Sequence, residues 1–237
     1  MYKDYLLEEK MPLFWCAGCG NGITLQAIFR GMDSLGWTKE NTVVTTGIGC
    51  WGKADDYVTT NSFHGTHGRA LPVSTGIALA NPDLNVVTLM GDGDGATIGG
   101  NHLIHAARRN INLTAILVNN LNYGMTGGQY SGTTPKHAIT KTSPYGHVEN
   151  GFDICKLVAA SGAPYVARAT VFDVVQLQKL CLRKASLLLR SSHRAPPTME
   201  DPIKLVMPQL CFNGSKTIQY QRSRLIRCLK KNLSENM

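Results

Sequence analysis

The sequence lacks the features of a membrane-spanning or exported protein. Its 237 residues contain no apolar run of about 18 residues or more, the length that a membrane-spanning helix requires. The first residues do not combine a basic segment with an apolar one, as a secretory signal would. Internal repeats and low-complexity tracts are also missing. We therefore expect a cytoplasmic protein with neither a membrane span nor a signal peptide.

An even distribution of charge is missing as well. The net charge is +8, yet residues 1–180 hold 13 Lys and Arg against 13 Asp and Glu. Residues 181–237 hold 11 basic and three acidic residues, and only one glycine, Gly214, of the 24 in the chain. Because the whole excess of positive charge lies in this segment, we do not expect the chain to bind nucleic acid. We predict a domain over 1–180 and an atypical, poorly ordered basic tail over 181–237.

Alternating strand and helix patterns fill the first 180 residues. Short β-rich runs end at glycine or asparagine turns, and helical patterns separate them, which favours an α/β fold with a mostly parallel sheet flanked by helices. The expected strands are 41–46, 85–90, 113–118 and 165–170, and the expected helices are 71–80, 99–109, 152–161 and 171–182.

Two polar loops follow neighbouring strands of this predicted sheet. Gly91-Asp92-Gly93 ends the strand at 85–90, and Asn119-Asn120 ends the strand at 113–118. A right-handed crossover between parallel strands brings both loops to the same edge. Carboxylate and amide oxygens suit Mg²⁺, and glycines allow close approach to phosphate. A plain turn is the alternative for this loop alone, and an EF-hand is excluded because Leu103 stands where its glutamate belongs.

The residues after these loops resemble a known family. The run from Tyr123 to Gln129, Tyr-Gly-Met-Thr-Gly-Gly-Gln, together with Ser131 and Thr133-Thr134-Pro135, resembles the β subunit of 2-oxoacid:ferredoxin oxidoreductases, a thiamine-diphosphate-binding fold. The run from Ile98 to His102 is most similar to the 2-oxoglutarate type. The resemblance extends over about residues 12–180, and Gly132 stands where this family usually has proline.

This resemblance implies a set of cofactor residues. Asp92 and Asn120 would bind Mg²⁺ through side chains, and Asn122 would bind it through its carbonyl oxygen. The diphosphate of thiamine diphosphate would lie against the glycine loop and against the segment after Asn122. The implied cofactor-binding residues are Ile48, Gly49, Cys50, His67, Gly68, Gly91, Gly93, Asp94, Gly124, Met125 and Thr126.

The cysteines indicate metal or redox chemistry. Cys16 and Cys19 form a Cys-x-x-Cys pair, whose spacing alone leaves a zinc knuckle, a redox dithiol and an iron–sulfur site open. Cys50 lies in a loop that also fits G-x-G-x-x-G, but His67 lies in the region where a nicotinamide-binding fold would place an acidic residue. The resemblance instead implies a 4Fe-4S cluster held by Cys16, Cys19 and Cys50. Cys155 fits a packed core thiol.

The tail departs from the family. The expected Leu-x-x-Cys-Pro-Thr segment, which would supply the fourth cysteine, is absent, and Cys181, Cys211 and Cys228 have other neighbours. Permitted codons for residues 188–201, read two bases out of frame, can encode Leu-Thr-Pro-Cys-Pro-Thr-Asn-Tyr-Gly-Arg. We therefore hypothesise a frameshift that begins between about residues 180 and 189. A divergent basic tail with its own role is the alternative.

The resemblance implies oxidative decarboxylation of a 2-oxoacid, most similar to the 2-oxoglutarate type, to its acyl-CoA. Electrons would pass to ferredoxin, and the implied partners are an α subunit, ferredoxin, the 2-oxoacid and coenzyme A. The implied cofactors are thiamine diphosphate, Mg²⁺ and the 4Fe-4S cluster. A non-oxidative thiamine-diphosphate decarboxylase and a non-catalytic cofactor-binding remnant are the alternative functions.

Overall fold

A parallel sheet forms the centre of the computed structural model, which describes residues 2–181 and 204–209. Within these ranges the sheet has six strands in the order β2-β1-β3-β4-β8-β7, and every neighbouring pair is parallel. A short antiparallel ribbon, β5 with β6, stands apart from it. The strands are β1 (Thr42–Thr46), β2 (Asn61–His64), β3 (Asn85–Gly91), β4 (Thr114–Val118), β5 (Asn122–Tyr123), β6 (Gln129–Tyr130), β7 (Tyr165–Thr170) and β8 (Lys204–Gln209).

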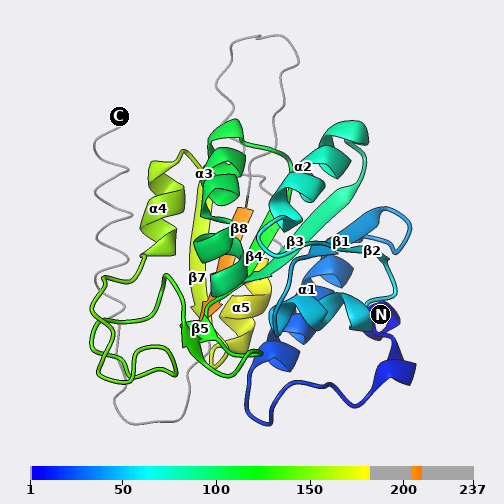
Figure 1. Ribbon diagram of the computed structural model, residues 1–237. Coiled ribbons are helices and arrows are strands. Elements are labelled where there is room, and N and C mark those ends of the chain that lie inside the picture. The colour runs from blue at the N-terminus through cyan, green and yellow to red at the C-terminus, as the bar shows by residue number, and fades with distance from the viewer. Residues whose placement is uncertain (1, 182–203, 210–237) are drawn as a thin grey trace.

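Helices cover both faces of the sheet (Figure 1). One face carries α1 (Asn21–Ser34) and α5 (Val174–Cys181), which pack against each other. The other face carries α2, α3 and α4. These three helices are α2 (Ala70–Ala80), α3 (Gly100–Arg109) and α4 (Ile154–Ala160). The short helices are the 3₁₀-helices η1 (Tyr2–Tyr5), η2 (Glu8–Lys10) and η3 (Trp51–Tyr57), and the π-helix η4 (Gly93–Ile98). No helix in the described ranges is both long and apolar enough to cross a membrane.

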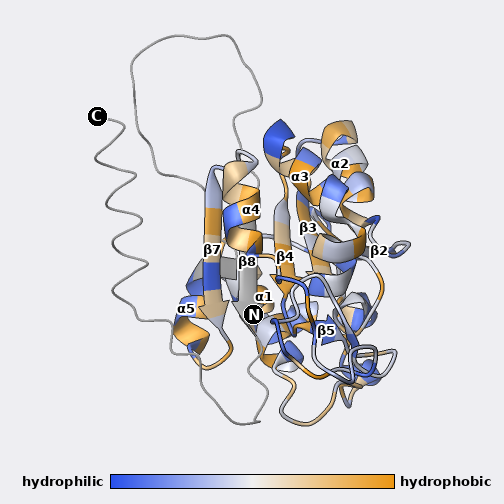
Figure 2. Ribbon diagram, turned by 60° about the vertical axis from the view of Figure 1, so that its left-hand side comes forward, coloured by the Kyte–Doolittle hydropathy of each residue, from blue (hydrophilic) through white to orange (hydrophobic). Residues whose placement is uncertain are grey.

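The central strands supply side chains to two cores. Leu89 and Ile116 belong to the core under α1 and α5, whereas Met90 and Leu117 belong to the core under α2, α3 and α4. Successive residues of a strand point to opposite faces, so a strand buried on both faces reads as a continuous apolar run. Figure 2 shows the hydrophobic colour over much of β3 and β4.

The predicted fold class is confirmed, and the predicted elements are found with small shifts at their ends. The helix expected at 152–161 begins at Ile154 because the Asp153 carboxylate accepts a hydrogen bond from the backbone N–H of Lys156 and so caps it. The helix expected at 171–182 begins at Val174, where Asp173 accepts from the N–H of Gln176 in the same way. The sequence analysis missed α1, β2 and β8.

The predicted tail contributes one strand to the sheet. Residues 204–209 form β8, which lies between β4 and β7 and pairs with both. Strand pairing uses backbone groups and so does not depend on the side chains of this segment; Pro208, paired with Ala169, can offer only its carbonyl oxygen. The remainder of 181–237 after Cys181 lies outside the described residues, so the domain boundary and the reading-frame hypothesis stay predictions.

The order of the strands opens a crevice at one edge of the sheet. β1 and β3 are neighbours, but the chain leaves β1 toward β2 and leaves β3 toward β4. The two connections diverge at the carboxyl ends of β1 and β3. Open α/β sheets bind their ligands at such a switch point.

Candidate active site

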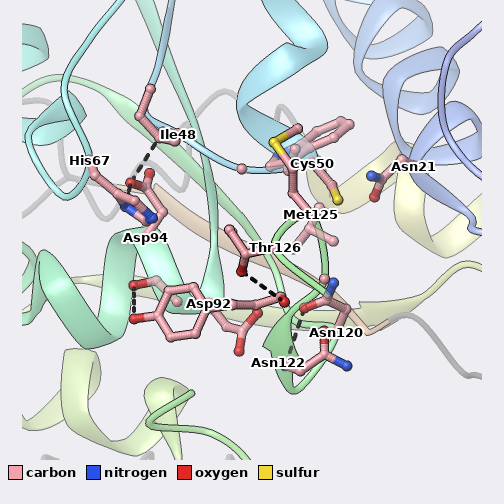
Figure 3. Close-up of a pocket in the computed structure, with 17 residues that line it drawn as sticks. Asn21, Ile48, Cys50, His67, Asp92, Asp94, Asn120, Asn122, Met125 and Thr126 are labelled. Carbon is pink, nitrogen blue, oxygen red and sulfur yellow. Dashed lines mark hydrogen bonds and ion pairs between the residues drawn. The ribbon is translucent and has the colours of Figure 1, made fainter. Parts of the chain in front are cut away.

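Loops at the carboxyl ends of β1, β3 and β4 surround a pocket in this crevice (Figure 3). The pocket encloses about 570 Å³ of empty space, part of it open to solvent, which is within the usual range for small-molecule sites. It is lined by every residue predicted to bind thiamine diphosphate or Mg²⁺ except Gly68. The other lining residues are Asn21, Trp51, Val118 and Tyr123.

Three oxygen-bearing groups meet at one side of the pocket. The Asp92 side chain, in a residue only 1% exposed, points toward the amide of Asn120. One terminal atom of that amide lies 2.8 Å from Asp92 Oδ1 and 2.7 Å from the carbonyl oxygen of Asn122. A nitrogen at this position would donate to both, whereas an oxygen there would complete a set of three acceptors around one point. Such a set fits a hard divalent cation.

Opposing effects set the protonation of Asp92. Burial is the largest effect and leaves the pKa of its carboxyl raised, although hydrogen bonds from the Ser131 and Thr133 hydroxyls and from the backbone N–H of Asn120 lower the pKa. A cation beside the carboxylate would favour the ionised form further. The site is thus suited to a carboxylate whose charge is balanced by a bound ion.

Asp94 ties two other loops to the pocket. Its Oδ1 atom accepts hydrogen bonds from the backbone N–H of Ile48 at 3.3 Å, the N–H of Gly68 at 2.7 Å and the ring nitrogen Nδ1 of His67 at 2.6 Å. Figure 3 shows His67 and Ile48 facing this carboxylate. Because the carboxylate already binds these donors and would repel a phosphate, a diphosphate contact from Asp94 would have to use its backbone N–H.

Two glycines permit the close packing around the pocket. A Cβ atom on Gly93 would overlap the ring of Tyr123, whose Cδ1 atom would lie 2.7 Å away. A Cβ atom on Gly124 would lie 3.3 Å from the Asn122 amide oxygen and 3.7 Å from Cys50 Sγ. Gly124 therefore marks the place where the cation-site asparagines approach the cysteine loop.

The Cys-x-x-Cys segment packs against the loop that contains Cys50. The indole N–H of Trp15 donates to the carbonyl oxygen of Cys50 at 2.5 Å, and the Trp15 ring lies 5.7 Å from that of Trp51. Burial raises the pKa of Cys50, and the neighbouring charges of Cys19 and Cys16 raise it further. The Trp15 contacts therefore hold the Cys-x-x-Cys segment against the Cys50 loop.

The cysteine arrangement differs from that of a single-ion site. Cys16 is exposed, Cys19 and Cys50 are partly buried, and none of these three forms a disulfide. Among the described residues, no group of three or more His, Cys, Asp and Glu side chains is arranged to hold one metal ion. In a 4Fe-4S cluster each cysteine binds a different iron atom, so its cysteines lie further apart than the ligands of a single ion.

Comparison with known proteins identifies the family. Residues 44–186 match the thiamine pyrophosphate enzyme family, C-terminal TPP binding domain. A 2-oxoglutarate synthase subunit KorB from Archaeoglobus fulgidus is 56% identical over 178 residues, which are 75% of this chain and 66% of that protein. The chain belongs to the 2-oxoacid:ferredoxin oxidoreductase β subunits.

Two further proteins, one from a curated sequence and one from a solved structure, show the same family similarity. A 2-oxoglutarate oxidoreductase subunit KorB from Mycobacterium tuberculosis is 44% identical over 72% of this chain and 45% of its own length. The solved 2-oxoglutarate:ferredoxin oxidoreductase from Magnetococcus marinus superposes with a TM-score of 0.78 at 35% identity, over 94% of this chain and 72% of that one. The chain spans 62–66% of the length of the first three curated relatives.

Some residues of the site were not recognised from the sequence. Asn21 belongs to α1, an element that the sequence analysis missed, and its side-chain oxygen is buried without a hydrogen-bond partner. Ser131 and Thr133 were noted only as part of the family resemblance, yet their hydroxyls bind Asp92 directly. Their short polar side chains, close behind the Asn119-Asn120 loop, are the signal that could have placed them there.

Proposed function

We propose that this chain binds thiamine diphosphate and Mg²⁺ as the β subunit of an enzyme that oxidatively decarboxylates 2-oxoglutarate. The products are CO₂ and the acyl-CoA, with electrons passed to ferredoxin. The observation that carries this proposal is the convergence of Asp92 Oδ1, the side-chain amide of Asn120 and the carbonyl oxygen of Asn122 at the switch point, beside the Cys50 loop. The names of the curated relatives, and the 2-oxoglutarate, coenzyme A and succinyl-CoA bound in the solved relative, support the choice of substrates.

In this proposal, oxygen ligands hold the cation and backbone groups hold the diphosphate. Asp92 and Asn120 bind Mg²⁺ through side chains and Asn122 binds it through its carbonyl oxygen. The backbone of Gly93, Asp94, Gly124, Met125 and Thr126 approaches the diphosphate, with Gly91 at the end of β3. Ile48, Gly49, Cys50, His67 and Gly68 line the remainder of the cofactor site. When bound, thiamine diphosphate supplies a nucleophilic carbon and accepts the electron pair that decarboxylation releases.

Cys16, Cys19 and Cys50 are the proposed ligands of a 4Fe-4S cluster. The closeness of Cys50 Sγ to Gly124 supports a cluster beside the cofactor pocket, where it would accept the electrons that pass to ferredoxin. We propose a cytoplasmic location, since thiols without disulfides persist in a reducing compartment. An α subunit completes the enzyme.

Cofactor binding tests the proposal without any need for activity. The tryptophan fluorescence of the chain, to which Trp51 in the pocket wall contributes, should change on addition of thiamine diphosphate with Mg²⁺ and should not change when a chelator removes the cation. Absence of binding to the full chain with Mg²⁺ present would contradict the proposal.

Iron content separates this function from a non-oxidative decarboxylase. Anaerobically purified protein should contain iron and show the visible absorbance of a cluster. Cys16→Ser should lose both, whereas Cys155→Ser, on α4, should retain them. Iron-free protein that still binds the cofactor would favour the non-oxidative enzyme.

A ferredoxin-reduction assay separates an enzyme from a remnant. The chain is combined with an α subunit and compared with a frame-restored version that contains the Cys-Pro-Thr segment. Activity of the frame-restored version alone would show that the present chain is a non-catalytic remnant. Inactivity of both, with cofactor and iron bound, would contradict the proposed reaction.

A further inference from the structure

A buried turn of hydroxyl residues lies directly behind the proposed cation site. It follows β6 and comprises residues 131–134, Ser-Gly-Thr-Thr. Ser131, Thr133 and Thr134 are 1%, 5% and 1% exposed. Buried hydroxyl groups need hydrogen-bond partners, and the partners of these three belong to the two loops that supply the cation ligands.

The first set of contacts holds one oxygen of Asp92. The Ser131 hydroxyl donates to Asp92 Oδ2 at 2.5 Å, and the Thr133 hydroxyl donates to the same atom at 2.6 Å. The backbone N–H of Thr133 donates to the Ser131 hydroxyl oxygen at 3.3 Å, which fixes the two residues relative to each other. Because both hydroxyls occupy Oδ2, the carboxylate presents Oδ1 to Asn120.

The second set of contacts holds the loop after β4. Thr133 Oγ1 also lies 3.0 Å from the side-chain oxygen of Asn119, a second acceptor that shares the one hydroxyl proton with Asp92 Oδ2. The Thr134 hydroxyl donates to the carbonyl oxygen of Leu121 at 2.6 Å and accepts from the backbone N–H of Ser131 at 2.9 Å. Leu121 has a φ of 66°, a conformation that a leucine rarely adopts, so this hydrogen bond stabilises a strained position between Asn120 and Asn122.

A third contact anchors the turn itself. The backbone N–H of Gly132 donates to the Thr97 hydroxyl oxygen at 2.8 Å, and Thr97 belongs to η4, the helix that begins after Asp92. The turn is therefore connected to the loop after β3 at both Asp92 and Thr97, and to the loop after β4 at Asn119 and Leu121.

We infer that Ser131 and Thr133 are positioning residues for the divalent cation: they direct Asp92 Oδ1 toward Asn120 and set the separation of the two ligand loops. The inference rests on the proposed function, because it assigns these hydroxyls to the same cation site. Both residues act through Asp92 and are not themselves proposed ligands of the ion. Removal of such outer partners typically costs about 10–100-fold in metal affinity.

The test measures cation affinity with the full chain. Mn²⁺ replaces Mg²⁺, and its binding is followed by electron paramagnetic resonance in the presence of saturating thiamine diphosphate. Thr133→Val and Ser131→Ala remove one hydroxyl each, and Thr133→Ser keeps the hydroxyl. Thr88→Val is the matched control. Thr88 lies on β3, four residues before Asp92, and its hydroxyl is also buried but donates to Ser74 and not to the cation site.

Thr133→Val and Ser131→Ala should each weaken Mn²⁺ binding by about tenfold or more, whereas Thr133→Ser and Thr88→Val should stay within about twofold of the parent chain. Rescue by serine distinguishes positioning from general packing, which the loss of a methyl group would also disturb. If the parent chain binds Mn²⁺ and Thr133→Val binds it equally well, the inference is overturned. If Thr133→Ser weakens binding as much as Thr133→Val, it is also overturned. If the parent chain binds no Mn²⁺, the proposed function itself fails.

Discussion

Replacement of Asp94 should show how strongly this carboxylate holds the pocket together. Its Oδ1 atom accepts hydrogen bonds from the backbone N–H groups of Ile48 and Gly68 and from the His67 ring, and these donors come from two separate loops. Asp94→Ala would leave the buried N–H of Gly68 and the partly buried N–H of Ile48 without acceptors. Asp94→Asn would retain an oxygen at the same position.

The expected loss follows from the number of donors that remain unpaired. An unsatisfied buried polar group costs about 1–3 kcal/mol, so two backbone N–H groups predict a loss of about 2–5 kcal/mol for Asp94→Ala, allowing for partial exposure of Ile48. This is a large part of the roughly 5–15 kcal/mol that stabilises a typical domain. Asp94→Asn exchanges charged for neutral hydrogen bonds and should cost about 1–2 kcal/mol.

Urea unfolding of the protein without thiamine diphosphate and Mg²⁺ measures both variants, since bound ligands would add their own stabilisation. Asp83→Ala, a change at an exposed turn, is the matched control and should stay within about 0.5 kcal/mol of the parent chain. A free energy of unfolding for Asp94→Ala within about 1 kcal/mol of the parent would refute the reasoning. Equal losses for Ala and Asn would refute it as well.

Further predictions concern the glycine loop and the thiols. Gly93→Ala should abolish thiamine diphosphate binding, measured by calorimetry, because its Cβ atom would displace the Tyr123 ring, whereas Gly76→Ala on α2, where the added atom meets open space, should leave binding unchanged. Burial raises the pKa of Cys155, so in cluster-free protein its alkylation at neutral pH should be slower than that of exposed Cys16 and should accelerate as the pH rises, measured by mass spectrometry; equal rates for the two thiols would contradict this. Chelation of divalent cations should weaken thiamine diphosphate binding by about tenfold or more, since in the proposed site the diphosphate would lose the cation that offsets its charge.

The elements around the pocket were predictable because their sequence signals are local. β3 and β4 are buried on both faces and read as apolar runs, and each ends in a polar loop at the pocket. β2 was missed because all four of its residues are exposed at an edge of the sheet, where the apolar pattern of a buried strand is absent.

The contacts within the site could be predicted only in part. That Asp92 and Asn120 lie together follows from adjacent parallel strands, which a reading of the sequence supplies. That two hydroxyls bind Asp92 Oδ2 depends on the path of residues 123–131, which form only a two-residue ribbon and otherwise follow no regular pattern. The role of Asp94 was likewise hidden, because its partners lie 26–46 positions earlier in the chain.

The place of β8 between two earlier strands has a consequence for how the protein assembles on the ribosome. β7 pairs with β8 at six positions and with no other strand in the described ranges, and β8 pairs with β4 at three. During synthesis, β4 and β7 are complete before residues 204–209 exist. Until then β7 lacks the strand with which it pairs, and the edge of β4 that β8 will cover has no partner strand. A nascent chain arrested near residue 200 would therefore expose unpaired strand edges that are paired in the finished protein. Such edges can pair with strands of other chains.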